Sequence, residues 1–107
     1  MKEECIFCRI VKGEIKAEKI GESENFMAIK DVNPKVEGHT LIIPKQHWIT
    51  IMDIPESYGK ELLGFIKRMC SKLMRELNAE GFNLEMNNFE SAGQVVMHAH
   101  IHILPRN

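Results

Sequence analysis

Hydrophobic residues change their spacing from one segment of the chain to the next. The segment from Asn25 to Asp31 carries four consecutive apolar residues and residues 40–43 carry a second apolar run, so each predicts a short buried strand. Residues 82–86 alternate between apolar and polar side chains, which predicts a strand with one solvated face. We expect the last strand from Val95 to Leu104.

The remaining apolar residues follow a helical period. From Pro55 to Asn78 they recur at intervals of three and four, as on one face of an amphipathic helix. Residues 5–11 are apolar enough for a short helix that ends near Gly13. Short strands around one long helix, without regular strand–helix alternation, predict an α+β fold. We therefore expect a mainly antiparallel sheet, one long helix and a short N-terminal helix.

Length and charge restrict the class of protein. The chain has 107 residues and no internal repeat or linker, so we expect a single domain over residues 1–107. Fourteen Lys and Arg against fifteen Asp and Glu give a net charge of −1, without the excess of positive charge that binding to nucleic acid requires. No uninterrupted apolar run exceeds four residues. We therefore expect a cytoplasmic protein with no nucleic-acid or membrane partner.

Three histidines alternate near the C-terminal end, at His98, His100 and His102. On a strand, alternate side chains share one face, so the three rings would stand in a row about 6.6 Å apart. Imidazole acts as base, acid, nucleophile or metal ligand near neutral pH, whereas a merely solvated face would carry mixed Lys, Thr, Glu and Ser. The preceding loop of small residues, 91–94, offers backbone amides for an anion. Loop and strand together predict a phosphoryl-transfer site.

The residues around these histidines resemble a known family. Residues 5–15, 31–34, 38–45 and 93–106 are similar, in that order, to the motifs of the histidine triad nucleotide-binding (HIT) superfamily. The resemblance implies a HIT-like fold and an enzyme that cleaves a purine nucleotide at its α-phosphorus. The implied substrate is a nucleoside phosphoramidate or a dinucleoside polyphosphate, and the implied assembly is a homodimer.

The same resemblance implies a role for each site residue. His100 would be the nucleophile that becomes a nucleotidyl-histidine, His102 would donate to the phosphate and leaving group, and His39 would orient or relay protons. The implied substrate contacts are Asp31 to the ribose, Phe7, Ile29 and Val32 to the base, and Asn87, Gly93, Gln94 and Val95 to the phosphate. Val95 departs from the family pattern, because many relatives carry Ser or Thr there.

A pair of cysteines, Cys5 and Cys8, supplies two thiolates at the spacing of half a tetrahedral zinc site. His47 and His98 are the available candidates for the other two ligands. The zinc-binding branch of the HIT superfamily resembles this arrangement, which implies a structural zinc ion. Two other interpretations stay open, namely a redox-active pair and two buried thiols that only fill space.

Two further hypotheses about function also stay open. The chain could be a nucleotide-binding or interaction module of the same fold with little turnover, because Val95 removes a hydroxyl contact to phosphate. Alternatively, all three histidines of the triad could ligate one catalytic metal ion. The hypotheses differ in whether His100 bonds to phosphorus, only binds nucleotide or coordinates a metal.

Overall fold

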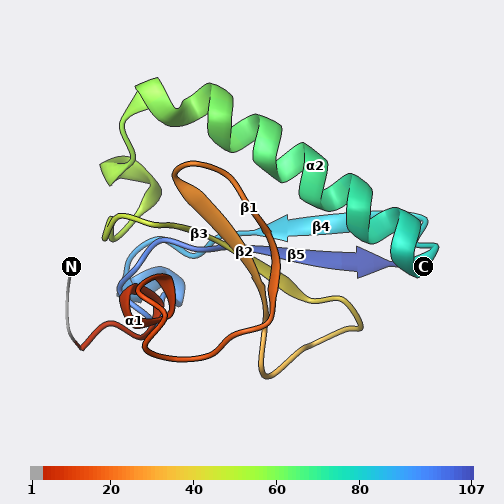
Figure 1. The fold of residues 1–107 in the computed structure, drawn as a ribbon, viewed down its shortest axis with the longest axis horizontal. Helices are drawn as coiled ribbons and strands as arrows, with labels where there is room; N and C mark the ends of the chain where they lie inside the picture. The colour runs from red at the N-terminus through yellow and green to blue at the C-terminus, as the bar shows by residue number, and fades with distance from the viewer. Residues whose placement is uncertain (1–3) are drawn as a thin grey trace.

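A computed structural model describes residues 4–107 and contains one five-stranded antiparallel sheet (Figure 1). The order of the strands across the sheet is β1-β2-β3-β5-β4, so a crossover places the last strand in the interior and β4 at an edge. This arrangement confirms the predicted α+β class. The strands are β1 (Lys19–Glu22), β2 (Phe26–Lys30), β3 (Thr40–Pro44), β4 (Gly81–Glu85) and β5 (Ile101–Arg106).

Helices cover both faces of the central strands. The long helix α2 (Gly59–Leu77) lies along one face (Figure 1), where Phe65 packs with Phe26 and Ile42. The short helix α1 (Ile6–Val11) packs on the other face, against the alternate residues of the same two strands. Because both faces are covered, the apolar residues of β2 and β3 form continuous runs. Neither helix has the length and apolar character needed to cross a membrane.

The long helix begins four residues later than the predicted Pro55. Two 3₁₀ turns, η1 (Ile51–Asp53) and η2 (Glu56–Tyr58), precede it. The first turn is closed by a capping box, in which the Asp53 carboxylate accepts from the Thr50 N–H at 3.0 Å. The helix ends as predicted, because Asn78 adopts a left-handed conformation with a φ of 52°.

The first and last strands differ from the prediction. β1 was missed because its four residues are exposed or half-buried, and it exists through pairing with β2. The last strand begins at Ile101 instead of Val95, so only His102 of the three histidines lies on it. The backbone bends at residues 96–98, and the Ala99 N–H bonds to the carbonyl of Trp48 at 2.7 Å.

Two glycines provide a matched test of packing next to His39. Gly38 and Gly13 both have positive φ, 84° and 83°, which disfavours any residue with a Cβ. A Cβ at Gly38 would collide with Leu77, whereas at Gly13 it would meet nothing within 4 Å. We expect Gly13→Ala to lower the free energy of unfolding by about 1 kcal/mol and Gly38→Ala by about 1–3 kcal/mol more, measured by urea denaturation. Equal losses would contradict tight packing at Gly38.

Candidate functional site

A cavity of about 320 Å³ lies on the sheet face opposite α2. Its apolar lining includes Phe7 from α1 and Ile29 from β2, and Asp31, His100 and His102 supply polar atoms. β3 pairs with β5 so that Leu41 stands opposite His102, which directs that ring to this face. Every residue predicted for the base and the ribose lines this one cavity; Val32, 84% exposed, completes the set.

His100 has one ring nitrogen fixed by the backbone. Its Nδ1 lies 2.7 Å from the carbonyl oxygen of His98, which can only accept, so Nδ1 carries the proton. In the neutral ring, Nε2 therefore keeps a free lone pair. The ring of Phe7 stands edge-on to His100, with the ring centroids 5.2 Å apart. The cavity thus contains an imidazole in the tautomer that leaves Nε2 nucleophilic.

His39 and His102 form a chain of hydrogen bonds that starts at the backbone. The Lys35 N–H donates to His39 Nδ1 at 3.1 Å, so the proton of the neutral His39 ring lies on Nε2. That nitrogen lies 2.8 Å from His102 Nδ1 and 3.4 Å from Asp31 Oδ2. His102 Nδ1 accepts, which leaves the proton of His102 on Nε2 as a donor.

Burial keeps these two rings neutral. It lowers the pKa of His39 below its ordinary value, although the Asp31 carboxylate opposes the shift. Burial also lowers the pKa of His102, and repulsion from His100 and His39 acts in the same direction. A neutral imidazole donates a hydrogen bond through one ring nitrogen and accepts one through the other, as both rings do in this chain of hydrogen bonds.

Cys5, Cys8, His47 and His98 come together beside α1, as the sequence predicted. Cys8 Sγ lies 3.2 Å from His47 Nδ1 and 3.6 Å from His98 Nδ1, and Cys5 Sγ lies 3.3 Å from His98 Nδ1. The two Nδ1 atoms are 3.2 Å apart. Tetrahedral zinc would hold sulfur and nitrogen ligands about 3.6 Å apart and two nitrogens about 3.3 Å apart. The donor set therefore fits one tetrahedral ion.

His98 connects this cluster to His100. Its Nε2 donates to the Pro44 carbonyl at 2.9 Å, which leaves the Nδ1 lone pair facing the thiols. Burial lowers the pKa of His98 to about 4, so the ring is neutral and able to bind a metal. Its own carbonyl accepts from His100 Nδ1. One residue thus contributes its ring to the Cys/His cluster and its backbone carbonyl to the hydrogen bond that orients His100.

The loop before His98 is held by a buried glutamine. The side chain of Gln94 accepts from the Phe89 N–H at 2.7 Å and donates to the Ile49 carbonyl at 2.6 Å. The side chain is therefore occupied within the protein, and only the backbone of Gln94 is available to a ligand. Gly93 has a φ of 96°, and Asn87 donates to its carbonyl at 3.4 Å.

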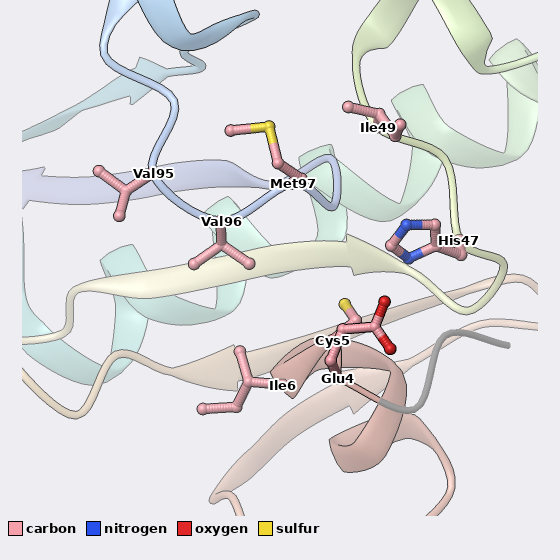
Figure 2. A pocket seen from close by; sticks show the side chains of 8 residues that line it. All are labelled: Glu4, Cys5, Ile6, His47, Ile49, Val95, Val96 and Met97. Atoms are coloured by element: carbon pink, nitrogen blue, oxygen red, sulfur yellow. The ribbon is translucent and has the colours of Figure 1, made fainter.

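A second cavity, of about 440 Å³, lies next to the Cys/His cluster, and Cys5 and His47 of that cluster line it. Figure 2 shows Val96 and Ile6 facing each other across it, with His47 near Cys5. Val95 also lines it and is 88% exposed. Sequence analysis missed this cavity, because its walls come from three separate segments and no local pattern joins them.

The triad is divided between two groups of ligands. His98 belongs with the cysteines, and His102 belongs with Asp31 and His39. Among the described residues, no group of metal ligands contains all three triad histidines. The hypothesis of one ion held by the whole triad is therefore wrong for this geometry.

Comparisons with known proteins agree with this fold. Residues 12–107 match the family model described as HIT domain. The chain is 39% identical over 106 residues to the adenosine 5′-monophosphoramidase HNT1 of Candida albicans, covering 95% of this chain and 70% of the relative. It is 37% identical over 106 residues to the adenylylsulfatase HINT3 of Arabidopsis thaliana, covering 99% of this chain and 54% of that protein. The crystal structure of a HIT family member from Bacillus subtilis superposes with a TM-score of 0.93 at 36% identity, covering 97% of this chain and 74% of the other.

The tautomers of His39, His100 and His102 can be measured directly. At pH 7.5 we expect long-range ¹⁵N NMR correlations to find His100 protonated on Nδ1, and His39 and His102 protonated on Nε2. In His39→Phe, the donor to His102 Nδ1 is lost, so His102 should populate both tautomers while His100 stays unchanged. A wild-type His102 protonated on Nδ1 would contradict the hydrogen-bond chain from Lys35.

Proposed function

The chain belongs to the HIT domain family, and from that premise we propose that it is a nucleotide hydrolase or nucleotidyl transferase of the zinc-binding branch. The proposed reaction is cleavage at the α-phosphorus of a purine nucleotide, either a nucleoside phosphoramidate or a dinucleoside polyphosphate. The observation that carries this proposal is the hydrogen bond from His100 Nδ1 to the His98 carbonyl, which in the neutral ring leaves the Nε2 lone pair free in a cavity that also contains Asp31 and His102. Two relatives have names that describe enzymes acting on adenylyl compounds, which supports the same reaction class.

The cavity supports a simple placement of the nucleoside. The base would lie against Phe7 and Ile29, with the exposed Val32 at its edge. Asp31 would accept hydrogen bonds from the ribose hydroxyls. Its Oδ1 already accepts from the Asn33 N–H at 2.9 Å, which holds the carboxylate in a fixed orientation.

The covalent route has two displacements. In the first, His100 Nε2 forms a bond to the α-phosphorus while the bond from phosphorus to the leaving group breaks. The His102 Nε2–H donates a hydrogen bond to the leaving group, which takes up a proton from solvent as it departs. Asn87 and backbone amides at residues 93–95 would stabilise the charge on the phosphoryl oxygens. In the second, water attacks phosphorus and releases a proton to solvent, the N–P bond breaks so that the lone pair returns to His100 Nε2, and the nucleoside monophosphate leaves.

We propose that Cys5, Cys8, His47 and His98 hold a structural zinc ion. The spacing of their donor atoms and the hydrogen bond from His98 Nε2 to the Pro44 carbonyl support this assignment. Zinc would supply a cross-link between α1 and the segment before β5, and the chemistry would stay with His100. The orientation of His100 would still depend on the site, because its Nδ1 bonds to the His98 carbonyl.

We also propose that the protein is a homodimer and that residues 1–107 form a single HIT domain. β4 is an edge strand, and its apolar residues Phe82 and Leu84 are 40% and 47% exposed. An apolar edge of this kind is suited to pairing with a second copy of the chain. The family match over residues 12–107 supports the single-domain proposal.

A second candidate function is a nucleotide-binding module with little turnover. Val95 favours it, since its exposed side chain offers no hydroxyl where phosphate would bind. The two candidates differ in one observable. The enzyme forms a covalent nucleotidyl adduct, whereas the module binds the nucleotide unchanged.

The covalent step is tested with adenosine 5′-phosphoramidate and mass spectrometry of the denatured protein. We expect wild type to carry a transient adenylyl adduct and His100→Ala to lack it, with turnover reduced by at least about 10³-fold because the attacking nitrogen is gone. Metal content and circular dichroism of the variant provide the folding control. A folded His100→Ala that cleaves as fast as wild type would overturn the mechanism, and tight binding without cleavage by wild type would favour the module.

The zinc proposal is tested by comparing two buried cysteines. Cys8 lies in the Cys/His cluster, whereas Cys70 lies on the buried face of α2, in the core between that helix and the sheet. We expect one zinc per chain in wild type and Cys70→Ser but none in Cys8→Ser, measured by elemental analysis. Zinc at 100 to 1,000 times its Kd should raise the free energy of unfolding by about 2.7–4.1 kcal/mol in wild type. Unchanged metal content in Cys8→Ser would argue for one of the rival interpretations of the cysteine pair.

A further inference from the structure

Phe89 has a backbone conformation that residues with a side chain rarely adopt. Its φ is 75° and its ψ is 155°, a combination that is essentially confined to glycine. The residue is 56% exposed, so burial of the ring does not offset the strain. We propose that Gln94 holds Phe89 in this strained conformation and thereby positions the Val95 N–H for the phosphoryl group of the substrate. The strain stands on the backbone geometry, and the role toward phosphate rests on the proposed function.

Two hydrogen bonds join Phe89 directly to Gln94. The Phe89 N–H donates to Gln94 Oε1 at 2.7 Å, and the Gln94 N–H donates to the Phe89 carbonyl at 3.1 Å. The same carbonyl accepts from the Ala92 N–H at 3.1 Å. Both backbone polar groups of Phe89 are therefore bonded to residues that follow it in the loop. A rotation of Phe89 to negative φ would separate at least one of these groups from its partner.

The side chain of Gln94 is itself held by two backbone carbonyls. It is buried, and its Nε2 donates to the Ile49 carbonyl at 2.6 Å and to the Val96 carbonyl at 3.1 Å. Both carbonyls can only accept, so the amide nitrogen must face them and Oε1 must face Phe89. Turning this buried amide would leave polar groups without partners, which costs more than the bonds themselves contribute. Gln94 is therefore rigid enough to hold a strained neighbour.

The same loop presents one unpaired backbone donor. The Gly93 N–H donates to the Glu90 carbonyl at 2.9 Å, inside the turn that begins at Phe89. Among the described residues, by contrast, the Val95 N–H has no partner within the protein. Val95 directly follows Gln94, so the position of its N–H depends on how Gln94 is held. A donor fixed in advance stabilises charge on a phosphoryl oxygen without reorganisation during the reaction.

The strain makes the loop depend on Gln94. Without its hydrogen bonds to Gln94, Phe89 would relax toward negative φ, and the residues up to Val95 would move with it. Glycine adopts positive φ without this cost, so it should keep the loop in place even when the amide is lost. Alanine lacks the ring but retains the Cβ that causes the strain. Substitutions at position 89 therefore separate the effect of the backbone from the effect of the ring.

The strain is tested by comparing glycine with alanine at position 89. Elsewhere alanine is the more stabilising of the two, because glycine loses more conformational freedom on folding. Here we expect the reverse order, with a higher midpoint of urea denaturation for Phe89→Gly than for Phe89→Ala. Both variants lack the ring, so only the Cβ distinguishes them. A lower midpoint for Phe89→Gly would overturn the strain.

The positioning role is tested by the contribution of phosphate to binding, measured as the ratio of the Kd for adenosine to the Kd for AMP. We expect Gln94→Met to lower this ratio at least about fivefold and kcat for adenosine 5′-phosphoramidate at least about tenfold. Its Kd for adenosine should not change, which shows that the nucleoside cavity is intact. Gln46→Met makes the same exchange at an exposed glutamine and should match wild type.

A double variant tests whether Gln94 acts through Phe89. Adding Phe89→Gly to Gln94→Met should recover the ratio at least about threefold, because glycine needs no support at this φ, whereas adding Phe89→Ala should recover nothing. Phe89→Val leaves the buried amide intact and serves if Gln94→Met does not fold. Its β-branched side chain fits positive φ poorly, so the ratio should fall at least about twofold.

The outcomes separate this proposal from the proposed function. Wild-type ratio and turnover in a folded Gln94→Met, an unchanged ratio in Phe89→Val, or equal recovery with glycine and alanine would overturn the positioning role and leave the proposed function intact. A wild-type protein that binds neither adenosine nor AMP would contradict the proposed function and the positioning of phosphate together. The order of glycine and alanine at position 89 would still decide whether Phe89 is strained.

Discussion

The position of His98 is the constraint on which the rest of the site depends. Its ring is buried between Cys5, Cys8 and His47 on one side and the Pro44 carbonyl on the other. The ring reaches this cluster from the segment before β5, which begins at Ile101. The carbonyl of the same residue then accepts the Nδ1 proton of the next histidine in the triad. The geometry of the Cys/His cluster and the orientation of His100 therefore both depend on one residue, through its side chain and its backbone.

Two neighbouring histidines acquire opposite tautomers from opposite backbone groups. A backbone acceptor, the carbonyl of His98, holds the proton of His100 on Nδ1. A backbone donor, the N–H of Lys35, acts through His39 and leaves the proton of His102 on Nε2. One ring therefore offers a lone pair and the other offers a proton, although the two side chains are chemically identical.

Burial on both faces of β2 and β3 separates structural support from chemistry. α2 covers one face with Phe65 and its neighbours, and none of the buried residues of that cluster carries an ionisable group except Cys70. The other face receives only the short α1, which leaves room for the cavity beside Phe7. α1 supplies Phe7 to that cavity and Cys8 to the metal-binding cluster, so its anchoring affects both.

The sequence by itself determined the α+β class, the strands at β2 and β3 and the end of α2, because these follow from local period. It also gave the cysteine pair of the Cys/His cluster by its spacing, with His47 and His98 as candidates for the other two positions. Only the tertiary structure decided where β5 begins, that β1 exists and that the triad is divided between two groups. Those features depend on partners distant in the chain, such as the Trp48 carbonyl for the Ala99 N–H. Alternating residues share one face only as far as the strand extends. The distant backbone groups that determine where the strand begins cannot be recognised from the residues around its first position.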